Sequence, residues 1–433
     1  MKKSPITLHP CLQSILQGES PSFDDLFTAI HPNLPLLNEL QNTPQDPEWH
    51  AEGNVHIHSR MTLNALYQVL DQYELAEINA EERMLVILAS SLHDIAKAIT
   101  TRHADIEGIN RIIAPKHAQK GRSYLASLLG SLGLNAEQVE HIFSLVGFHH
   151  QPRTILRRTP DAHGAYWSLT RQVSPHLLNL LCQADLRGRI CPDQDSLVED
   201  QEYFFLCQQQ ALEELGPLHP EWDEIIHEQI KDLPPITQRF IRAHGRFEAE
   251  KGIITHPHEV IARSYKYRDR YAQLYIACGP SGIGKTTWMH QKYPQATLVS
   301  MDDIRKELTG SVTDQSKNRK VFQMAFNRVK SLLSTDQQII WDATTLRKEY
   351  RDQLIALADR YQAFSKIEVF IAPIEMALKR NRERERQVPA HVIENQYQQW
   401  EIPQRDEAHE VNYLMVHGEQ NWKDVDGEIA CRE

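Results

Sequence analysis

Two regions of the chain differ in how apolar and polar residues follow one another. From Trp49 to about Leu215, apolar residues recur every three or four positions, which is the spacing of helices with one buried face. From Tyr271 onward, short apolar runs alternate with helical segments, a pattern typical of a parallel sheet covered by helices. The pattern predicts a multidomain protein in which an all-α helical bundle precedes an α/β domain.

The same pattern gives approximate positions for the elements. Helices are expected at residues 61–70, 82–98, 120–132, 136–147 and 175–186. Strands are expected at 274–278, 296–300, 338–341 and 367–371, with 413–416 as an added edge strand. The proline-containing first 48 residues should form a helical lead-in that packs on the bundle. Prolines and mixed charge near the junction divide the chain into domains at 1–235 (core 49–215) and 271–433, joined by a linker at 236–270.

Composition limits the class of protein. The 433 residues suit two to three domains, and six scattered cysteines predict free thiols in a reducing cytoplasm, with neither a disulfide framework nor a zinc ribbon. The first residues lack an apolar segment and no apolar run reaches the roughly 18 residues of a membrane span, so neither a signal peptide nor membrane insertion is expected. A net charge of −11 argues against binding along the length of a polyanion such as a nucleic acid. It is compatible with binding the end of one strand through local basic residues.

A phosphate-binding loop is the most specific motif. An apolar run leads into a segment that fits G-x-x-x-x-G-K-[ST] and opens a helix, and its residues are Gly279, Pro280, Ser281, Gly282, Ile283, Gly284, Lys285, Thr286 and Thr287. Backbone N–H groups of such a loop face phosphate oxygens, and the helix N-terminus adds positive potential. Lys285 would reach the β- and γ-phosphates and Thr286 would bind Mg²⁺, so ATP or another NTP with Mg²⁺ is the expected ligand.

Three further motifs follow the loop. Asp302 stands at the end of the second expected strand, where an acceptor hydroxyl would need a base. Asp342 ends the third strand and would steady the Mg²⁺ shell. The arginine-rich residues 379–389 fit either a solvated helix face or a lid over the nucleotide phosphates, and their position after the fourth strand favours the lid.

Histidines and carboxylates recur within or at the edges of the helices of the first region. A lone histidine on a helix is usually structural, but this set makes a metal site of nitrogen and oxygen ligands: His58, His93, Asp94, His117, His149 and Asp185. His93 and Asp94 interrupt an apolar helix. Burying them without a partner would be costly, so a cation is the expected partner.

The five blocks that carry these residues resemble the HD-domain phosphohydrolase family, whose pattern is H…HD…H…H…D, over residues 49–215. The resemblance implies that His58, His93, Asp94 and Asp185 hold one metal, and that His117 and His149 hold a second with Asp94 bridging and serving catalysis. His150 is left as a second ligand or a phosphate contact, His56 is expected to face away, and His50 to be structural. Nitrogen-rich ligation favours Mn, Fe, Co, Ni or Zn over Mg, and a site of two such ions hydrolyses phosphoesters. Among the many basic residues nearby, Lys97 and Arg187 are the expected substrate contacts.

The motifs after the phosphate loop resemble 5′-hydroxyl polynucleotide kinases over residues 272–405. The resemblance implies that Asp302 activates the 5′-hydroxyl, Arg305 contacts the nucleic acid, and Arg384 stabilises the transferring phosphoryl group with Arg380 in support. Together the two halves resemble the bifunctional end-healing enzymes of bacterial nucleic-acid repair. Such an enzyme phosphorylates 5′-OH ends and hydrolyses 2′,3′-cyclic phosphate, 3′-phosphate or 2′-phosphate ends. Its products are the ends that a polynucleotide ligase joins.

Other readings of the sequence stay open. A small-molecule P-loop kinase could be fused to a metal-dependent nucleotide phosphohydrolase, although Arg305 and the arginines of 153–189 favour a nucleic acid. The P-loop domain could instead sense NTP and switch the other domain, a reading that Asp302 disfavours. A non-enzymatic nucleic-acid-binding module fits the negative charge least well. Preference for RNA or DNA and the oligomeric state do not follow from the sequence.

Overall fold

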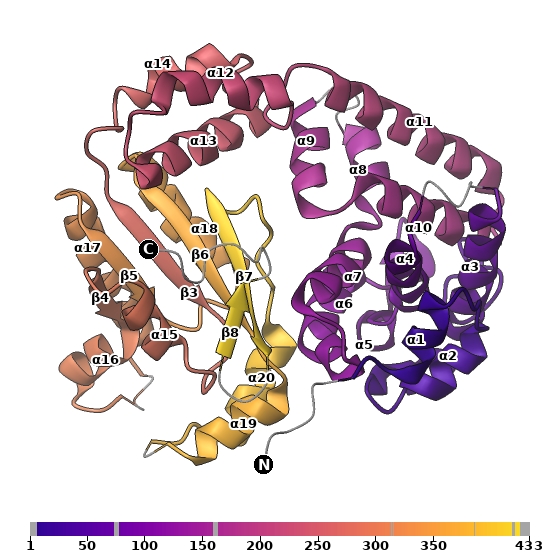
Figure 1. Ribbon diagram of the computed structural model, residues 1–433. Helices are drawn as coiled ribbons and strands as arrows, with labels where there is room; N and C mark the ends of the chain where they lie inside the picture. Colours follow the sequence, from indigo (N-terminus) through magenta and orange to yellow (C-terminus); the bar gives the residue numbers. More distant parts are fainter. Residues whose placement is uncertain are drawn as a thin grey trace. The chain divides into compact units, whose positions relative to one another are not determined.

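The chain forms two compact units, Met1–Ala211 (unit 1) and Leu212–Glu433 (unit 2), and each is described by itself. The structure is a computed structural model, and it describes residues 7–72, 78–158, 163–312, 314, 316–384, 386–417 and 421–424. Unit 1 is helical and unit 2 contains a largely parallel sheet, which confirms the expected fold class (Figure 1).

Unit 1 is a helical bundle in which α3 packs on α4 and α10, and α7 packs on α4 and α6. The lead-in forms α1 and α2 and a 3₁₀ helix, η1, and α1 packs on α4. The elements of the unit are α1 (Pro10–Leu16), α2 (Phe23–Ile30), η1 (Pro35–Asn42), α3 (Val55–Leu70), α4 (Ala80–Leu92), α5 (Lys97–Thr100), β1 (Arg102–Ile106), β2 (Ile109–Ile113), α6 (His117–Leu128), η2 (Leu129–Leu132), α7 (Ala136–Phe148), α8 (Gln151–Arg158), α9 (His163–Gln172), α10 (Pro175–Arg187) and α11 (Gln194–Glu213).

Two features of unit 1 differ from the expectation. The helix expected at residues 82–98 ends at Leu92, and a turn carries His93 and Asp94 before α5 begins. The hairpin β1–β2 was not expected, because its residues are largely exposed and show no regular apolar alternation. Its turn places Glu107 at φ 54° and Gly108 at φ 83°, as a two-residue hairpin turn requires.

Unit 2 is built on a six-stranded sheet in the order β4-β5-β3-β6-β7-β8, where only the β7–β8 pair is antiparallel. All four expected strands are present, and residues 413–416 lie in β7, which is flanked by β8 and is therefore not at the edge. The strands are β3 (Gln273–Cys278), β4 (Thr297–Ser300), β5 (Gln338–Asp342), β6 (Phe364–Ile371), β7 (Glu410–His417) and β8 (Asn421–Asp424). The helices are α12 (Pro220–Ile230), α13 (Pro235–Glu250), α14 (Pro257–Ser264), α15 (Lys285–Lys292), α16 (Met301–Thr309), α17 (Asn318–Leu333), α18 (Lys348–Arg360), α19 (Ile374–Arg382) and α20 (Ala390–Gln399).

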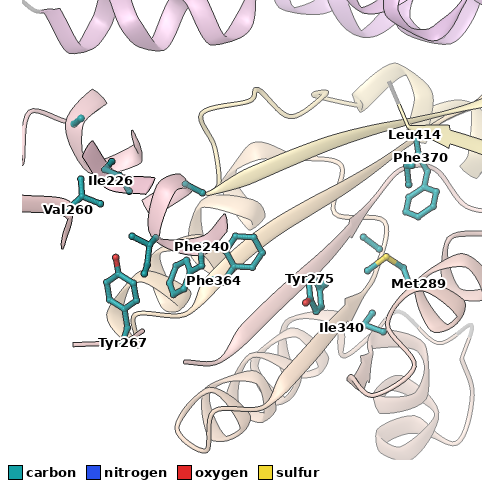
Figure 2. Packing of buried hydrophobic residues seen from close by; sticks show 14 of the residues in the cluster. Ile226, Phe240, Val260, Tyr267, Tyr275, Met289, Ile340, Phe364, Phe370 and Leu414 are labelled. Carbon is teal, nitrogen blue, oxygen red and sulfur yellow. The ribbon is translucent and has the colours of Figure 1, made fainter. Parts of the chain in front are cut away.

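Helices α12–α14 belong to the core of unit 2 (Figure 2). The Phe240 ring on α13 is fully buried and lies 5.4 Å from the Phe364 ring of β6 and 4.6 Å from the Tyr271 ring before β3. The linker expected at 236–270 and the first domain expected to end at 235 therefore differ from the division of the structure after Ala211. Prolines mark helix starts here rather than a linker, since Pro220, Pro235 and Pro257 are each the first residue of a helix.

A chain of buried polar contacts also ties α13 to the sheet. Nδ1 of His244 lies 2.8 Å from Nε2 of His409, whose Nδ1 lies 2.8 Å from the Ser365 hydroxyl on β6. Glu248, one turn further along α13, accepts two hydrogen bonds from Nε and one from Nη2 of Arg263 on α14. These contacts satisfy polar groups that burial would otherwise leave unpaired.

We predict that Phe240→Ala lowers the free energy of unfolding of unit 2 by about 3–5 kcal/mol, because it empties a fully buried site between α13 and the sheet. The change can be measured by urea unfolding followed through loss of ATP binding. Ile236→Ala on the same helix is the control, since Ile236 is largely exposed and should cost less than about 0.5 kcal/mol. Equal effects of the two substitutions would show that α13 is not part of this folding unit.

Candidate metal and nucleotide sites

Six side chains expected to bind metal come together in unit 1 from five helices and the turns that end two of them. Asn54 caps α3 and sets His58 one turn into the helix, and His93 and His149 are the residues that directly follow the last residues of α4 and α7. The elements that supply the set are α3 (His58), the turn after α4 (His93 and Asp94), the start of α6 (His117), the end of α7 (His149) and α10 (Asp185). Every member except His117, which is partly buried, is nearly inaccessible to solvent.

The ligand atoms form two neighbouring groups around Asp94. In the first group, Nε2 of His93 lies 3.3 Å from Oδ2 of Asp94, and Nε2 of His58 lies 3.0 Å from Oδ1 of Asp185. In the second group, Nε2 of His117 lies 3.1 Å from Oδ1 of Asp94. Because its two oxygens face different groups, Asp94 is placed as a carboxylate that bridges two cations would be.

The second group contains His150 as well as His117 and His149. Possible ligand atoms of the three rings lie within 4.8 Å of one another, and the Nε2 atoms of His117 and His150 are 3.0 Å apart. The sequence left the role of His150 open, and the structure brings its ring to the ligand set. His56, by contrast, faces away and lies 3.1 Å from Asp24, as expected.

The rings are oriented by contacts on the side away from the site. Nδ1 of His93, His117 and His149 lies 2.8, 2.7 and 2.6 Å from the backbone carbonyls of the residues three positions earlier. Nδ1 of His58 lies 2.9 Å from Glu52, a buried carboxylate that also contacts His50. Each Nε2 is therefore left to face the site, which is the usual arrangement around metal-bound histidine.

The electrostatics of the site suit cations. Burial would raise the pKa of Asp94, but Lys97 and His93 outweigh it and hold this pKa well below its ordinary value. Burial lowers the pKa of His149 to about 3, so its ring is neutral, and its buried Nε2 has no hydrogen-bond partner among the described residues. Burial would lower the pKa of His93, but Asp94 and Asp185 outweigh it and raise this pKa to about 10, so the His93 ring would give up a proton when it binds a cation. Neutral imidazoles and ionised carboxylates are the donors that Mn, Fe, Co, Ni and Zn ions prefer. Two such ions, when bound, would activate water and polarise a phosphate oxygen.

The basic residues near this site are placed differently from one another. Nζ of Lys97 lies 2.7 Å from Asp94 and 2.6 Å from the side-chain oxygen of Gln45, so it is buried in the ligand network. Arg187 is exposed and lies 3.4 Å from Glu202. Arg189 instead contacts the ligand set, because its Nη2 donates to both oxygens of Asp185 at 3.0 Å. Arg189 was not singled out by the sequence, although its spacing of four residues from Asp185 on a helix end would have been the signal.

The phosphate-binding loop of unit 2 runs from β3 to α15. Gly279 and Gly284 have φ values of 150° and 96°, and a Cβ on Gly279 would lie 2.7 Å from the Phe370 carbonyl oxygen, so glycine is required there. The ammonium of Lys285 donates to the Pro280 carbonyl at 2.8 Å and so lies over the loop.

Two residues from α19 and α20 hold the loop. Arg380 donates to the Ile283 carbonyl at 2.7 Å, so it supports the loop from behind. Gln396 accepts from the Ser281 N–H at 2.7 Å and donates to the Ser281 hydroxyl at 3.1 Å. The sequence gave no signal for Gln396, because a single glutamine on an amphipathic helix carries no distinguishing pattern.

The ends of the neighbouring strands complete the nucleotide site. The Thr286 hydroxyl donates to Asp342 at 2.9 Å, which brings the two expected Mg²⁺-binding groups together. Asp302 follows β4 and forms an ion pair with Arg305, and its other oxygen lies 3.4 Å from Arg386.

The lid arginines differ from the expectation in their contacts. Arg386 joins Asp302 to the Val312 carbonyl, to which it donates at 3.1 Å. Arg384 is exposed, yet it is close enough to Lys285 to lower the pKa of that lysine. The structure therefore adds Arg386 to the residues around Asp302, where an acceptor hydroxyl is expected. The loosely spaced arginine run did not single out this residue.

We predict that nucleotide affinity falls at alkaline pH. Burial lowers the pKa of Lys285 to about 8, with Asp342 opposing, and only the ammonium form attracts phosphate. The Kd for ATP should therefore be nearly constant below the pKa and rise about 20-fold between pH 7.5 and 9.5, since each unit above the pKa costs a factor of ten. Calorimetric titration of both the wild type and Lys285→Arg checks this. The variant should bind more weakly but without this pH dependence, because a guanidinium stays charged. A matching pH dependence in the two proteins would contradict the assignment to Lys285.

Comparison with protein families agrees with both sites. The family model described as HD domain matches residues 55–187, and the one described as AAA domain matches residues 274–403. No curated protein matches the chain. Among the described residues, no helix is both long and apolar enough to span a membrane. The chain thus joins an HD phosphohydrolase domain to a P-loop kinase-like domain, with a histidine- and aspartate-rich site that could hold metal in the first.

Proposed function

We propose that this chain heals nucleic-acid ends. Unit 2 would transfer the γ-phosphoryl group of ATP or another NTP to a 5′-OH end, and unit 1 would hydrolyse a 2′,3′-cyclic phosphate, 3′-phosphate or 2′-phosphate. The products, a 5′-phosphate and a 3′-OH, are what a polynucleotide ligase joins. The observation that carries the proposal is the position of Asp302, between two arginines and close enough to Lys285 to influence the pKa of its ammonium group.

The acceptor side supports a kinase rather than a nucleotide sensor. A carboxylate beside the phosphate loop can accept the proton of an attacking hydroxyl, a role that a sensor does not need. Arg305 and Arg386 pair with Asp302 and would contact phosphates of the acceptor strand. Thr286 and Asp342 would hold the Mg²⁺ that accompanies the nucleotide.

Charge on α17 favours a polymeric acceptor over a small molecule. Lys317, Arg319 and Lys320 are exposed at the start of α17, the first turn of which contains no acidic residue. Cations at a helix N-terminus oppose the helix dipole at about 0.3–1 kcal/mol each, so helix stability does not explain them. They adjoin the acceptor side, because Arg305 donates to Asn318 at 3.3 Å. If the 5′ end of an acceptor strand lies at Asp302, the phosphodiester backbone that follows it would pass beside these three cations.

The two activities should be separable by substitution. Asp302→Asn should lower 5′ phosphorylation by about 10²–10⁴-fold through loss of the base and leave 3′-end hydrolysis intact. Asp94→Asn should abolish hydrolysis by removing the bridging carboxylate and leave phosphorylation intact. Both are measured with γ-labelled ATP, Mg²⁺ and a 5′-OH oligonucleotide, and in parallel with a 2′,3′-cyclic phosphate end and Mn²⁺, Co²⁺ or Ni²⁺. Loss of both activities in either folded variant would refute the two-site assignment.

We further predict that replacing Lys317, Arg319 and Lys320 by Gln raises the KM for a long 5′-OH oligonucleotide and leaves the KM for a dinucleotide unchanged. The dependence of log KM on log salt should weaken by about 2 units, since each phosphate contact to a single strand contributes about 0.7. Lys330→Gln, at the other end of α17, is the control and should change neither value. If the triple variant phosphorylates the long oligonucleotide with wild-type kinetics, α17 does not contact the strand. If the wild type phosphorylates no oligonucleotide, the small-molecule kinase becomes the favoured reading.

A further inference from the structure

A small cavity in unit 1 adjoins the second histidine group. It has a volume of about 30 Å³, and its lining includes His149, His150, Arg153, Asp185, Arg189 and Asp200. A water molecule needs about 10–15 Å³ of such space, so the cavity admits a small polar group but not a nucleobase. Its walls come from the ends of α7 and α10 and from α8 and α11.

Hydrogen-bond donors that face this cavity lack acceptors. Nε of Arg153 and Nε of Arg189 are each buried, and neither has a hydrogen-bond partner in the part of the chain that the structure describes. An unpaired buried donor is costly, so two guanidinium donors beside one cavity indicate a missing acceptor. Arg189 is held in place by Asp185, and its Nη2 is already used there.

The local charge indicates that the acceptor is an anion. Burial lowers the pKa of Arg153, and the positive charges of Arg157 and Arg189 lower it further. Asp193 and Asp200 act in the opposite direction, but they do not outweigh this effect. The guanidinium of Arg153 is thus held near other cations in a partly dry environment, which is unfavourable until an anion binds.

We propose that this cavity binds the phosphoryl group of the ester hydrolysed in unit 1, and that Arg153 donates hydrogen bonds to its non-bridging oxygens. The inference rests on the proposed hydrolysis of phosphate ends and names the residue that contacts the group removed. A guanidinium fork matches two phosphate oxygens, and its position beside His149 and His150 sets the phosphorus next to the ligand groups.

The charge of the cavity also predicts a preference between substrates. A terminal phosphomonoester carries up to two negative charges and a 2′,3′-cyclic phosphate carries one. Arg153 and Arg189 together favour the dianion, so Arg153 should matter more for 3′- or 2′-phosphate ends than for cyclic ends. Hydrolysis of the monoester by water yields the 3′- or 2′-hydroxyl and inorganic phosphate, so inorganic phosphate should itself bind in the cavity.

Binding of inorganic phosphate to the metal-loaded full chain tests the proposal. All proteins carry Lys285→Ala, so that the phosphate loop does not contribute, and the Kd for phosphate is measured by calorimetry. Arg153→Gln should weaken binding by about 10- to 100-fold, the worth of hydrogen bonds to a charged group. Arg153→Lys should recover part of this affinity. Arg60→Gln is the matched control, since Arg60 pairs with Asp24 outside the cavity and should leave the Kd unchanged.

Metal content, measured by elemental analysis, shows whether each variant keeps its ligand groups. Wild-type phosphate affinity in Arg153→Gln at full metal content would overturn the proposal, as would a loss of phosphate binding in Arg187→Gln alone. If Arg153→Gln loses its metal, the comparison passes to Arg153→Lys, for which unchanged affinity would overturn the proposal and weakened affinity would support it. If the wild type hydrolyses no nucleic-acid end yet binds phosphate through Arg153, the end-healing function fails and the cavity assignment stands.

Discussion

Burial of the Asp94 carboxylate is the constraint on which the architecture of unit 1 depends. An ionised carboxylate is stable away from water only when cations or donors surround it, and here Lys97, His93 at the end of α4 and His117 at the start of α6 do so. The helices must therefore end where they do. α4 stops at Leu92, and in the turn that follows each oxygen of Asp94 faces a different histidine group. The bundle is thus arranged around a charge that its apolar residues alone could not accommodate.

In unit 2, the parallel sheet is the constraint that places the site residues. Parallel strands bring their carboxyl ends to one edge of the sheet. The strand order β4-β5-β3 therefore places three features close together: the loop after β3, Asp302 after β4 and Asp342 at the end of β5. At this edge the charges act on one another over short distances. Asp342, Arg384 and Asp302 all influence the pKa of Lys285, so a change at the acceptor side is felt at the phosphate loop. Asp302, Asp342 and Lys285, the expected base, magnesium group and phosphate-binding lysine, are therefore coupled electrostatically.

The sequence predicted what depends on local pattern and missed what depends on tertiary contacts. Strand and helix periodicity predicted the fold class of both units, because each kind of element has a fixed repeat. The order of the histidine blocks predicted which side chains lie together as possible metal ligands. The boundary near residue 235 differed from the structure, since the apolar face of α13 does not reveal which core it joins. Arg386 and Gln396 were missed because their partners, Asp302 and Ser281, are distant in the sequence. The hairpin β1–β2 was missed because exposed strands carry no apolar alternation.

The membership of α12–α14 in unit 2 has a practical consequence for dividing this protein. A fragment that begins at Tyr271, where the phosphate-loop pattern starts, would expose Phe364 and leave His409 without the histidine of α13 that it contacts. Such a fragment would present bare sheet to solvent and tend to aggregate, however complete its nucleotide site. A fragment that keeps the chain from Leu212 onward retains that cover. The fragment that contains the whole nucleotide site and the fragment that keeps the sheet covered thus differ by the three helices α12, α13 and α14.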